Sequence, residues 1–105
     1  MRRLVVLLLL IFMMDEARAE TGQVSYYSGG RVACRGMRVG PMTAAHRSLP
    51  CGTRVVATTR FGSARLTITD RGPFVRGRVL DVSYDAARVL GLLGPGHLPV
   101  SIIRE

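Results

Sequence analysis

The sequence predicts a mainly β domain, a compact barrel of short strands with one short helix. Several segments are rich in β-branched and aromatic residues or alternate apolar with polar residues, and glycine or proline introduces most of them. One segment alone has the pattern of a helix. Short strands with Gly-rich links and a single helix are typical of a barrel. The predicted strands cover residues 23–28, 53–59, 64–69, 77–83 and 98–104.

Two of these strands form a predicted hairpin. Residues 53–59 read TRVVATT and residues 64–69 read ARLTIT, with RFGS between them. A short connection that contains glycine commonly joins antiparallel strands. We therefore expect the two segments to pair with each other.

The helix is expected within residues 83–94, SYDAARVLGLLG. Ser83 can cap its N-terminus, and Asp85 lies in the first turn, where the helix dipole favours an acid. Gly91 or Gly94 ends the helix. The small apolar face that packs on the sheet is expected to consist of Ala86, Ala87, Val89 and Leu90.

Residues 1–19 are predicted to be a secretory signal peptide. Arginines precede an apolar run at 4–14, and Ala17-Arg18-Ala19 suits cleavage before Glu20. The run is shorter than the about 20 residues that span a bilayer, so we expect no stable membrane insertion after cleavage. An uncleaved anchor is the alternative, because acids stand close to the cut. The protein is therefore expected to be periplasmic or secreted.

Residues 20–105 are expected to form one small domain and to act as a monomer without a cofactor. Without residues 1–19 the chain keeps twelve arginines, five acids and no lysine, a net charge of +7. Such a charge attracts anionic polymers. Nucleic acid is a poor partner for an exported chain, whereas an anionic cell wall suits it.

Cys34 and Cys51 are the only cysteines. In an oxidising compartment a disulfide is the default, and closing a loop of this size stabilises a domain by about 3 kcal/mol on the loop-entropy model. Zinc is the competing interpretation, because His46 and His97 are available. It is weak without a CxxC or HxxxH pair, so we expect no metal.

Three acids lie away from the ends of the expected domain: Asp70, Asp81 and Asp85. Asp85 is explained by the helix, which leaves Asp70 and Asp81 for acid/base chemistry. Both lie near strand ends, and a barrel could bring them together. His46, in the dense stretch MTAAHRSLPCGT at 42–53, can donate to a carboxylate and orient it.

Taken singly, these residues also have structural explanations. A histidine beside a turn is more often a structural hydrogen-bonding group, and Asp70 before Arg-Gly-Pro can hold a turn or pair with Arg71. A serine nucleophile is weaker still, because no serine lies in a GxSxG setting.

Four stretches together carry more information: SYYS, TAAHRSLPCGTRV, TITDRGPFVRGRVLDVSYDAARVLG and the closing VSIIR. In order and spacing the sequence resembles the rare lipoprotein A family of septal-ring lytic transglycosylases over nearly all of residues 20–105. The resemblance implies a six-stranded double-psi β-barrel. Expansins and barwin-like proteins share this barrel, so the resemblance predicts the fold more firmly than the reaction.

The resemblance implies cleavage of the peptidoglycan glycan strand without water. The 6-hydroxyl of muramic acid attacks its own anomeric carbon and leaves an anhydro sugar. Ordinary glycosidases need two carboxyl groups, but here an internal hydroxyl replaces the water or the enzyme nucleophile. One acid/base carboxylate then suffices.

Matching the motifs residue by residue implies the roles. Asp70 matches the aspartate of DRGP and would protonate the leaving oxygen, then accept the hydroxyl proton. His46 matches the histidine of TAAH and would be its hydrogen-bonding neighbour. Asp81 matches the aspartate of D-x-S, which expansin-like barrels also use. Arg71 adjoins Asp70 and is expected at the substrate, although an adjacent cation lowers a carboxyl pKa.

An aromatic platform for the glycan is expected from Tyr26 and Tyr27, of which only one can face the groove if they are strand neighbours.

One departure from the family is Met37, which stands where the family has the glutamate of G-E-x-F. This departure favours the rival interpretation, an expansin-like barrel that binds wall glycan without cutting it. A third interpretation is a structural domain whose aspartates only hold turns.

Overall fold

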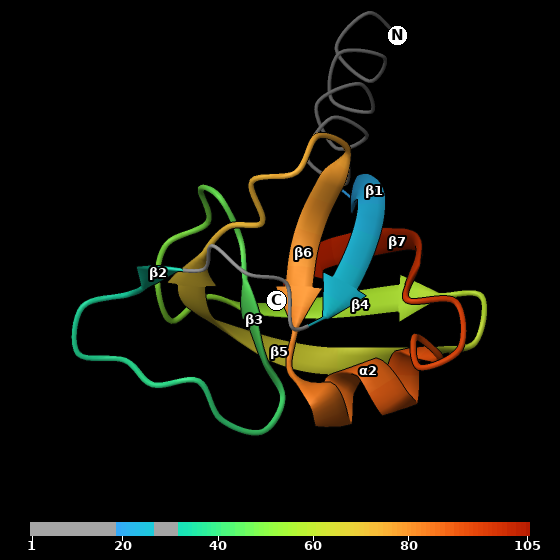
Figure 1. Cartoon of the computed structure of the whole chain (residues 1–105). Coiled ribbons are helices and arrows are strands. Elements are labelled where there is room, and N and C mark those ends of the chain that lie inside the picture. Colours follow the sequence, from blue (N-terminus) through green and yellow to red (C-terminus); the bar gives the residue numbers. More distant parts are fainter. Residues whose placement is uncertain (1–18, 27–31) are drawn as a thin grey trace, which may run out of the picture.

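The computed structural model describes residues 19–26 and 32–105, which form seven strands and one helix (Figure 1). All seven strands belong to a single sheet. The elements are β1 (Ala19–Tyr26), β2 (Val32–Ala33), β3 (Thr43–Ala45), β4 (Arg54–Thr59), β5 (Gly62–Arg71), β6 (Arg78–Val82), α2 (Tyr84–Leu90) and β7 (His97–Arg104).

The sheet closes on itself. Its order is β2-β5-β3-β6-β1-β7-β4, and β4 also pairs with β5, so six strands form a closed ring with the two-residue β2 at its side. The pairs β1–β6 and β3–β5 are parallel, and the remaining pairs are antiparallel. The predicted six-stranded double-psi barrel with one short helix is thereby confirmed.

The predicted hairpin is confirmed as β4 and β5, which pair from Arg54↔Thr67 to Thr59↔Gly62. The first strand begins earlier than expected, at Ala19, because its first residues pair with β7. No strand was predicted at β2 or β3. Two or three residues are too few to show an alternating pattern, and pairing with longer strands supplies their hydrogen bonds.

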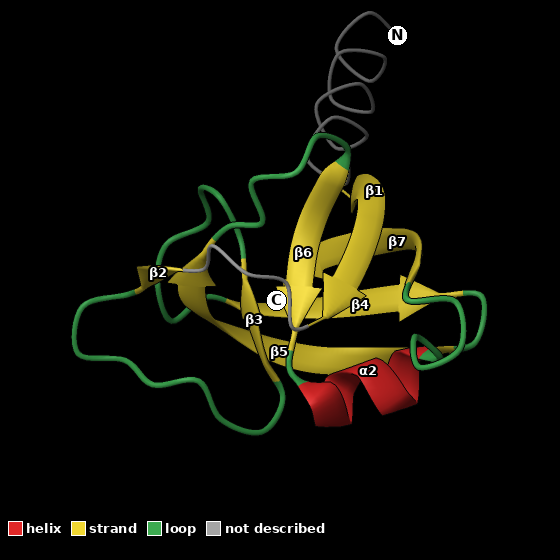
Figure 2. Ribbon diagram, viewed as in Figure 1, coloured by secondary structure: helices red, strands yellow, loops and turns green. Residues whose placement is uncertain are grey.

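The helix forms as predicted but is shorter (Figure 2). It ends at Gly91, whose φ is 77°. Two details of the prediction are wrong. Ser83 stands at the N-cap position, but its hydroxyl donates to Asp85 Oδ1 at 2.6 Å and does not cap the helix. Val89 faces solvent, so the packed face consists of Ala86, Ala87 and Leu90.

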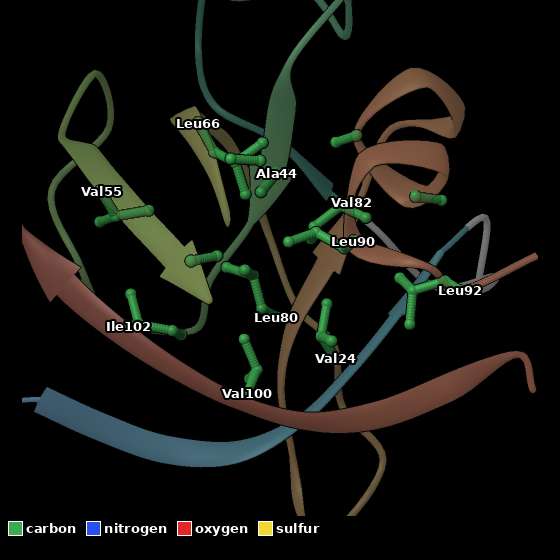
Figure 3. Packing of buried hydrophobic residues seen from close by; sticks show 14 of the residues in the cluster. Val24, Ala44, Val55, Leu66, Leu80, Val82, Leu90, Leu92, Val100 and Ile102 are labelled. Carbon is green, nitrogen blue, oxygen red and sulfur yellow. The ribbon is translucent and has the colours of Figure 1, made fainter. Parts of the chain in front are cut away.

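The core fills the barrel and continues under the helix (Figure 3). Alternate residues of the strands point inward, as the period of a strand requires; on β5 these are Leu66 and Ile68, and on β6 Leu80 and Val82. The helix adds Leu90, whose carbonyl accepts the Thr59 hydroxyl at 2.7 Å. The helix is therefore part of the same packed unit.

The predicted disulfide is confirmed, since Cys34 and Cys51 are joined with an S–S distance of 2.10 Å. Neither sulfur is then a thiolate, the form in which cysteine binds zinc. The predicted signal peptide lies outside the described residues except for Ala19, which begins β1. Within the described parts of the chain, no helix has the length and apolar character needed to cross a bilayer.

Candidate active site

Asp70 and Asp81 are brought to one level of the barrel by the short strand β3. Ala45 is the register partner of Asp70 on β5 and also of Asp81 on β6. Neighbouring strands lie about 4.8 Å apart, so the two aspartate backbones are roughly 10 Å apart across β3. Eleven positions separate the aspartates in sequence, and the pairing of both strands with β3 places them on either side of Ala45.

Asp70 lies next to the last residue of β5 and is 3% exposed. The Thr69 hydroxyl donates to its Oδ1 at 2.6 Å. The register between β3 and β5 shifts between Ala44 and Ala45, so Asp70 and not Thr69 stands opposite Ala45. The shift is one reason why strand alternation in the sequence could not predict where this carboxylate lies.

Asp81 is fully buried in β6. Ser25, its register partner on the parallel strand β1, donates its hydroxyl to Asp81 Oδ1 at 3.3 Å. The sequence predicted no role for Ser25, which does not lie in a GxSxG setting. Its neighbour relation depends on the β1–β6 pairing, which no local pattern encodes.

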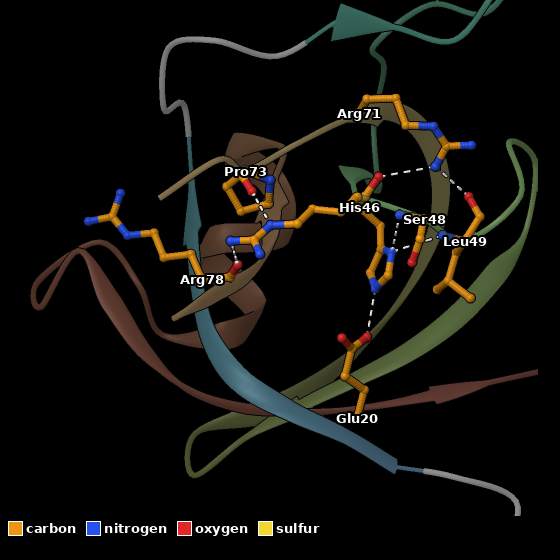
Figure 4. Close-up of polar contacts among 8 residues, drawn as sticks. Glu20, His46, Ser48, Leu49, Arg71, Pro73 and Arg78 are labelled. Atoms are coloured by element: carbon orange, nitrogen blue, oxygen red, sulfur yellow. Dashed lines mark hydrogen bonds and ion pairs between the residues drawn. The ribbon is translucent and has the colours of Figure 1, made fainter. Parts of the chain in front are cut away.

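His46 follows β3 and is held by three hydrogen bonds (Figure 4). Its Nδ1 accepts the backbone N–H groups of Ser48 at 3.1 Å and Leu49 at 3.0 Å. Nε2 therefore carries the ring proton and donates it to Glu20 Oε1 at 2.6 Å. The link between His46 and Asp70 runs through the backbone, from the His46 N–H to the Asp70 carbonyl at 3.1 Å.

Glu20 is one of the site neighbours that sequence reasoning missed. It was considered only as the first residue after the predicted cleavage point, and 26 positions separate it from His46. No spacing rule connects the two. Met37, where a glutamate was expected, lies in the loop between β2 and β3.

Arg71 holds the turn that carries His46. Its guanidinium donates to the carbonyls of His46, at 3.1 Å, and Leu49, and lies 3.2 Å from Cys51 Sγ. These bonds make Arg71 a positioning group for the turn at 46–51, and its contact with substrate stays a prediction.

Arg47 links the same turn to the loop after β5, and sequence reasoning missed it. Its Nε donates to the Pro73 carbonyl at 2.7 Å, and its terminal nitrogen donates to the carbonyls of Val75 at 2.9 Å and Arg78 at 3.1 Å. A planar guanidinium suits several acceptors at once. Arg47 and Arg71 therefore hold two loops beside Asp70.

The rings of Tyr26 and Tyr84 meet edge to face, with centroids 6.4 Å apart. Tyr26 packs partly on the core, whereas Tyr84 is 45% exposed. Tyr27 lies outside the described residues. Tyr84, which the prediction did not include, lines a surface hollow together with Val39, Gly40, Pro41, Ser83 and Asp85.

Asp85 anchors the chain before β3. The Ser83 hydroxyl lowers the pKa of Asp85 below its ordinary value of 3.8, burial opposes this, and the Met42 N–H, 2.9 Å from Oδ2, lowers the pKa further. Met42 has a φ of 53°, a costly conformation for a residue other than glycine. The Asp85 carboxylate therefore holds a strained residue directly before β3.

The family model described as lytic transglycolase matches residues 19–102, which include β1 to β6, the helix, most of β7 and both aspartates. The chain belongs to the lytic transglycolase family. Within this family it has the RlpA-like double-psi barrel that the motifs indicated.

Two curated relatives of this family illustrate the match. The probable endolytic peptidoglycan transglycosylase RlpA of Nostoc sp. is 54% identical over 90 residues, 77% of this chain and 24% of that protein. The protein of the same name from Synechocystis sp. is 43% identical over 96 residues, 83% of this chain and 30% of that protein. The chain thus spans less than a third of these relatives.

Among solved structures, the barrel resembles that of an expansin from Clavibacter michiganensis. The apo form superposes with a TM-score of 0.69 at 27% identity, covering 84% of this chain and 50% of the expansin. A point mutant of that expansin in complex with cellohexaose gives a TM-score of 0.66 at 25% identity.

Proposed function

We propose that this protein is an exported lytic transglycosylase that cleaves the glycan strand of peptidoglycan and leaves anhydro-muramic ends. The names of its relatives and its family membership support this proposal. The observation that carries it is the register of β3, which sets Asp70 and Asp81 on the two strands that flank Ala45.

In the proposed reaction, protonated Asp70 gives its proton to the glycosidic oxygen as the bond from the anomeric carbon to that oxygen breaks. The 6-hydroxyl oxygen of the same muramic residue forms the new bond to the anomeric carbon. Its proton returns to a carboxylate, so no water is consumed. A single acid/base group can in principle perform both proton transfers.

The residues around Asp70 would act as positioning groups. His46 is joined to Asp70 through its backbone, and Arg47 and Arg71 hold the loops on either side. Asp81, fixed by Ser25, would orient the glycan or support Asp70. This division of roles needs no metal or cofactor.

The proposal includes export. Residues 1–19 would be removed as a signal peptide, and residues 20–105 would act as a monomeric domain in the periplasm or outside the cell. A net charge of +7 after removal of residues 1–19 would favour the anionic wall. Peptidoglycan is the proposed partner.

An expansin-like binding function is the second candidate. The superposition on an expansin barrel favours it, as does Met37 in place of the family glutamate. In that case the same aspartates would bind wall glycan without breaking it.

The deciding experiment incubates the purified protein with peptidoglycan and analyses the soluble products by mass spectrometry. A transglycosylase releases anhydro-muramic products, lighter by one water than the products of hydrolysis. Asp70→Asn, an uncharged near-isostere, serves as the matched inactive variant. Wild-type protein that binds peptidoglycan but releases no anhydro product, under conditions where an active transglycosylase does, would favour the expansin-like function.

A further inference from the structure

Glu20 and His46 form a contact that no sequence motif indicates. Glu20 Oε1 lies 2.6 Å from His46 Nε2 (Figure 4). The backbone of Glu20 is fixed because it pairs with Ile102 on β7. The carboxylate therefore extends from a strand that is held in the barrel, which is a firmer support than a loop.

The contact has a defined polarity. His46 Nδ1 already accepts the N–H groups of Ser48 and Leu49, so the ring cannot rotate without losing both bonds. The proton on Nε2 consequently points at Glu20. An ionised carboxylate is an acceptor-only group and suits this donor. The fixed His46 ring thus positions the carboxylate of Glu20.

Accessibility separates Glu20 from the aspartates. The side chain of Glu20 is 47% exposed, whereas that of His46 is 5% exposed. Asp70 and Asp81 are buried. Of these carboxylates, that of Glu20 is the one that solvent reaches most readily.

The sequence places no other carboxylate in the loop where the family has its glutamate. Met37 occupies the position of the glutamate in the family motif G-E-x-F, so the loop between β2 and β3 offers no carboxylate there. Glu20 brings a carboxylate to His46 from β1 instead.

We propose that Glu20 is the solvent-facing carboxylate of the site, that it contacts the glycan, and that His46 is its positioning residue. The inference rests on the proposed function for its reaction. Asp70 gives its proton to the leaving oxygen, and the Glu20 carboxylate takes the proton of the 6-hydroxyl as that oxygen bonds to the anomeric carbon. Exchange of one proton from Glu20 to Asp70 through water restores the starting state.

This assignment links processing to activity. The predicted cleavage point lies directly before Glu20, so the mature chain would begin with the residue that completes the site. Cleavage one residue later would remove the carboxylate while leaving His46, Asp70 and Asp81 in place. The identity of the first mature residue would then matter for catalysis.

The test compares Glu20→Gln, Glu20→Ala and the control Glu105→Gln in exported protein that retains Ala19, because a glutamine at the N-terminus would cyclise and lose its side-chain amide. The amide introduced by Glu20→Gln could still accept the His46 N–H but could not take a proton, whereas Glu20→Ala would lose both properties. Glu105 pairs with Arg65 at 3.1 Å and controls for the loss of one negative charge. We expect both Glu20 variants to release anhydro products about 10²- to 10⁴-fold more slowly, the range for a lost acid/base group, with Glu105→Gln unchanged.

A second measurement keeps the inference separate from the proposed function. The imidazole ¹⁵N–¹H signal of His46 is followed while naked glycan strands are added. We expect the signal to shift in the wild type, and Glu20→Gln to bind the strands more weakly while its other resonances stay those of the folded protein.

Each outcome decides the question. If the wild type and Glu20→Gln are equally active and only Glu20→Ala is impaired, the inference is overturned. Glu20 would then merely hold the ring of His46. A wild type that releases no anhydro product would overturn the proposed function alone. In that case a glycan-induced shift at His46 that Glu20→Gln weakens supports the contact with Glu20, and the absence of such a shift overturns it.

Discussion

Asp70 and Asp81 stand on opposite sides of Ala45, each as its register partner, although they belong to strands that never pair with each other. The three residues of β3 therefore set the spacing of the two buried aspartates. A helix or loop in this position would leave the two strands without a shared neighbour to fix the spacing of the aspartates.

The first prediction concerns these aspartates. Asp70→Asn should abolish release of anhydro products, by about 10²- to 10⁴-fold, because an amide cannot shuttle a proton. Asp81→Asn should slow the reaction less, since it keeps the hydrogen bond with Ser25. Product release is measured by mass spectrometry and folding by circular dichroism. If Asp70→Asn unfolds the domain, an aspartate that holds its turn is the better explanation.

The second prediction concerns Arg47. Arg47→Ala removes three donors to backbone carbonyls and should lower the free energy of unfolding by about 1 to 3 kcal/mol, the range for charged hydrogen bonds. Amide exchange in residues 73–78 should accelerate. Arg47→Lys keeps the charge but not the fork, so it should restore only part of the loss. Complete rescue by lysine would contradict the geometric argument.

The third prediction concerns the disulfide. Replacing Cys34 and Cys51 by alanine should destabilise the domain by about 2 to 5 kcal/mol, as for other small secreted domains. Urea unfolding of this variant is compared with that of the reduced wild type, and the two should agree. Thiol labelling of unreduced wild-type protein at two equivalents would show that the bond does not form in the cell.

The fourth prediction separates charge from aromatic contact in glycan binding. Tyr84→Ala should weaken binding by about fivefold, equivalent to about 1 kcal/mol, even at high salt. Salt screens the arginines but not the exposed ring. Tyr26→Ala should mainly lower stability, because Tyr26 packs on the core. Equal binding by Tyr84→Ala and wild type would remove Tyr84 from the binding surface.

The fifth prediction concerns pH. The pKa of Asp85 is lower in the folded chain than its ordinary value of 3.8, chiefly because Ser83 donates to the carboxylate. The resulting stabilisation is fully present above about pH 4 and is lost as the pH falls through the lower, folded value. Asp85→Asn should therefore unfold more easily than wild type at pH 7 and more nearly like it near pH 2. A pH-independent difference in urea midpoint would contradict this cause.

The sequence by itself determined the elements whose signals are local. The alternation in residues 53–59 and 64–69, with a glycine between them, sufficed for the β4–β5 hairpin. Asp85 marked the first turn of the helix, and Gly91 was one of two glycines predicted to end it. Two cysteines in a chain with a predicted signal peptide sufficed for the disulfide. The motifs around His46 and Asp70 sufficed for the family. Each inference needs only residues close together in sequence, or a count.

Only the tertiary structure decided which groups meet at the site. Closure of the sheet brings Glu20 on β1 to His46, which follows β3, across 26 positions of sequence, and the packing of two loops brings Arg47 to Pro73. The register shift in β3 selects Asp70 over Thr69 as the neighbour of Ala45. Such contacts depend on barrel closure and strand register, which arise from burying the whole core at once and leave no periodic signal in any one segment.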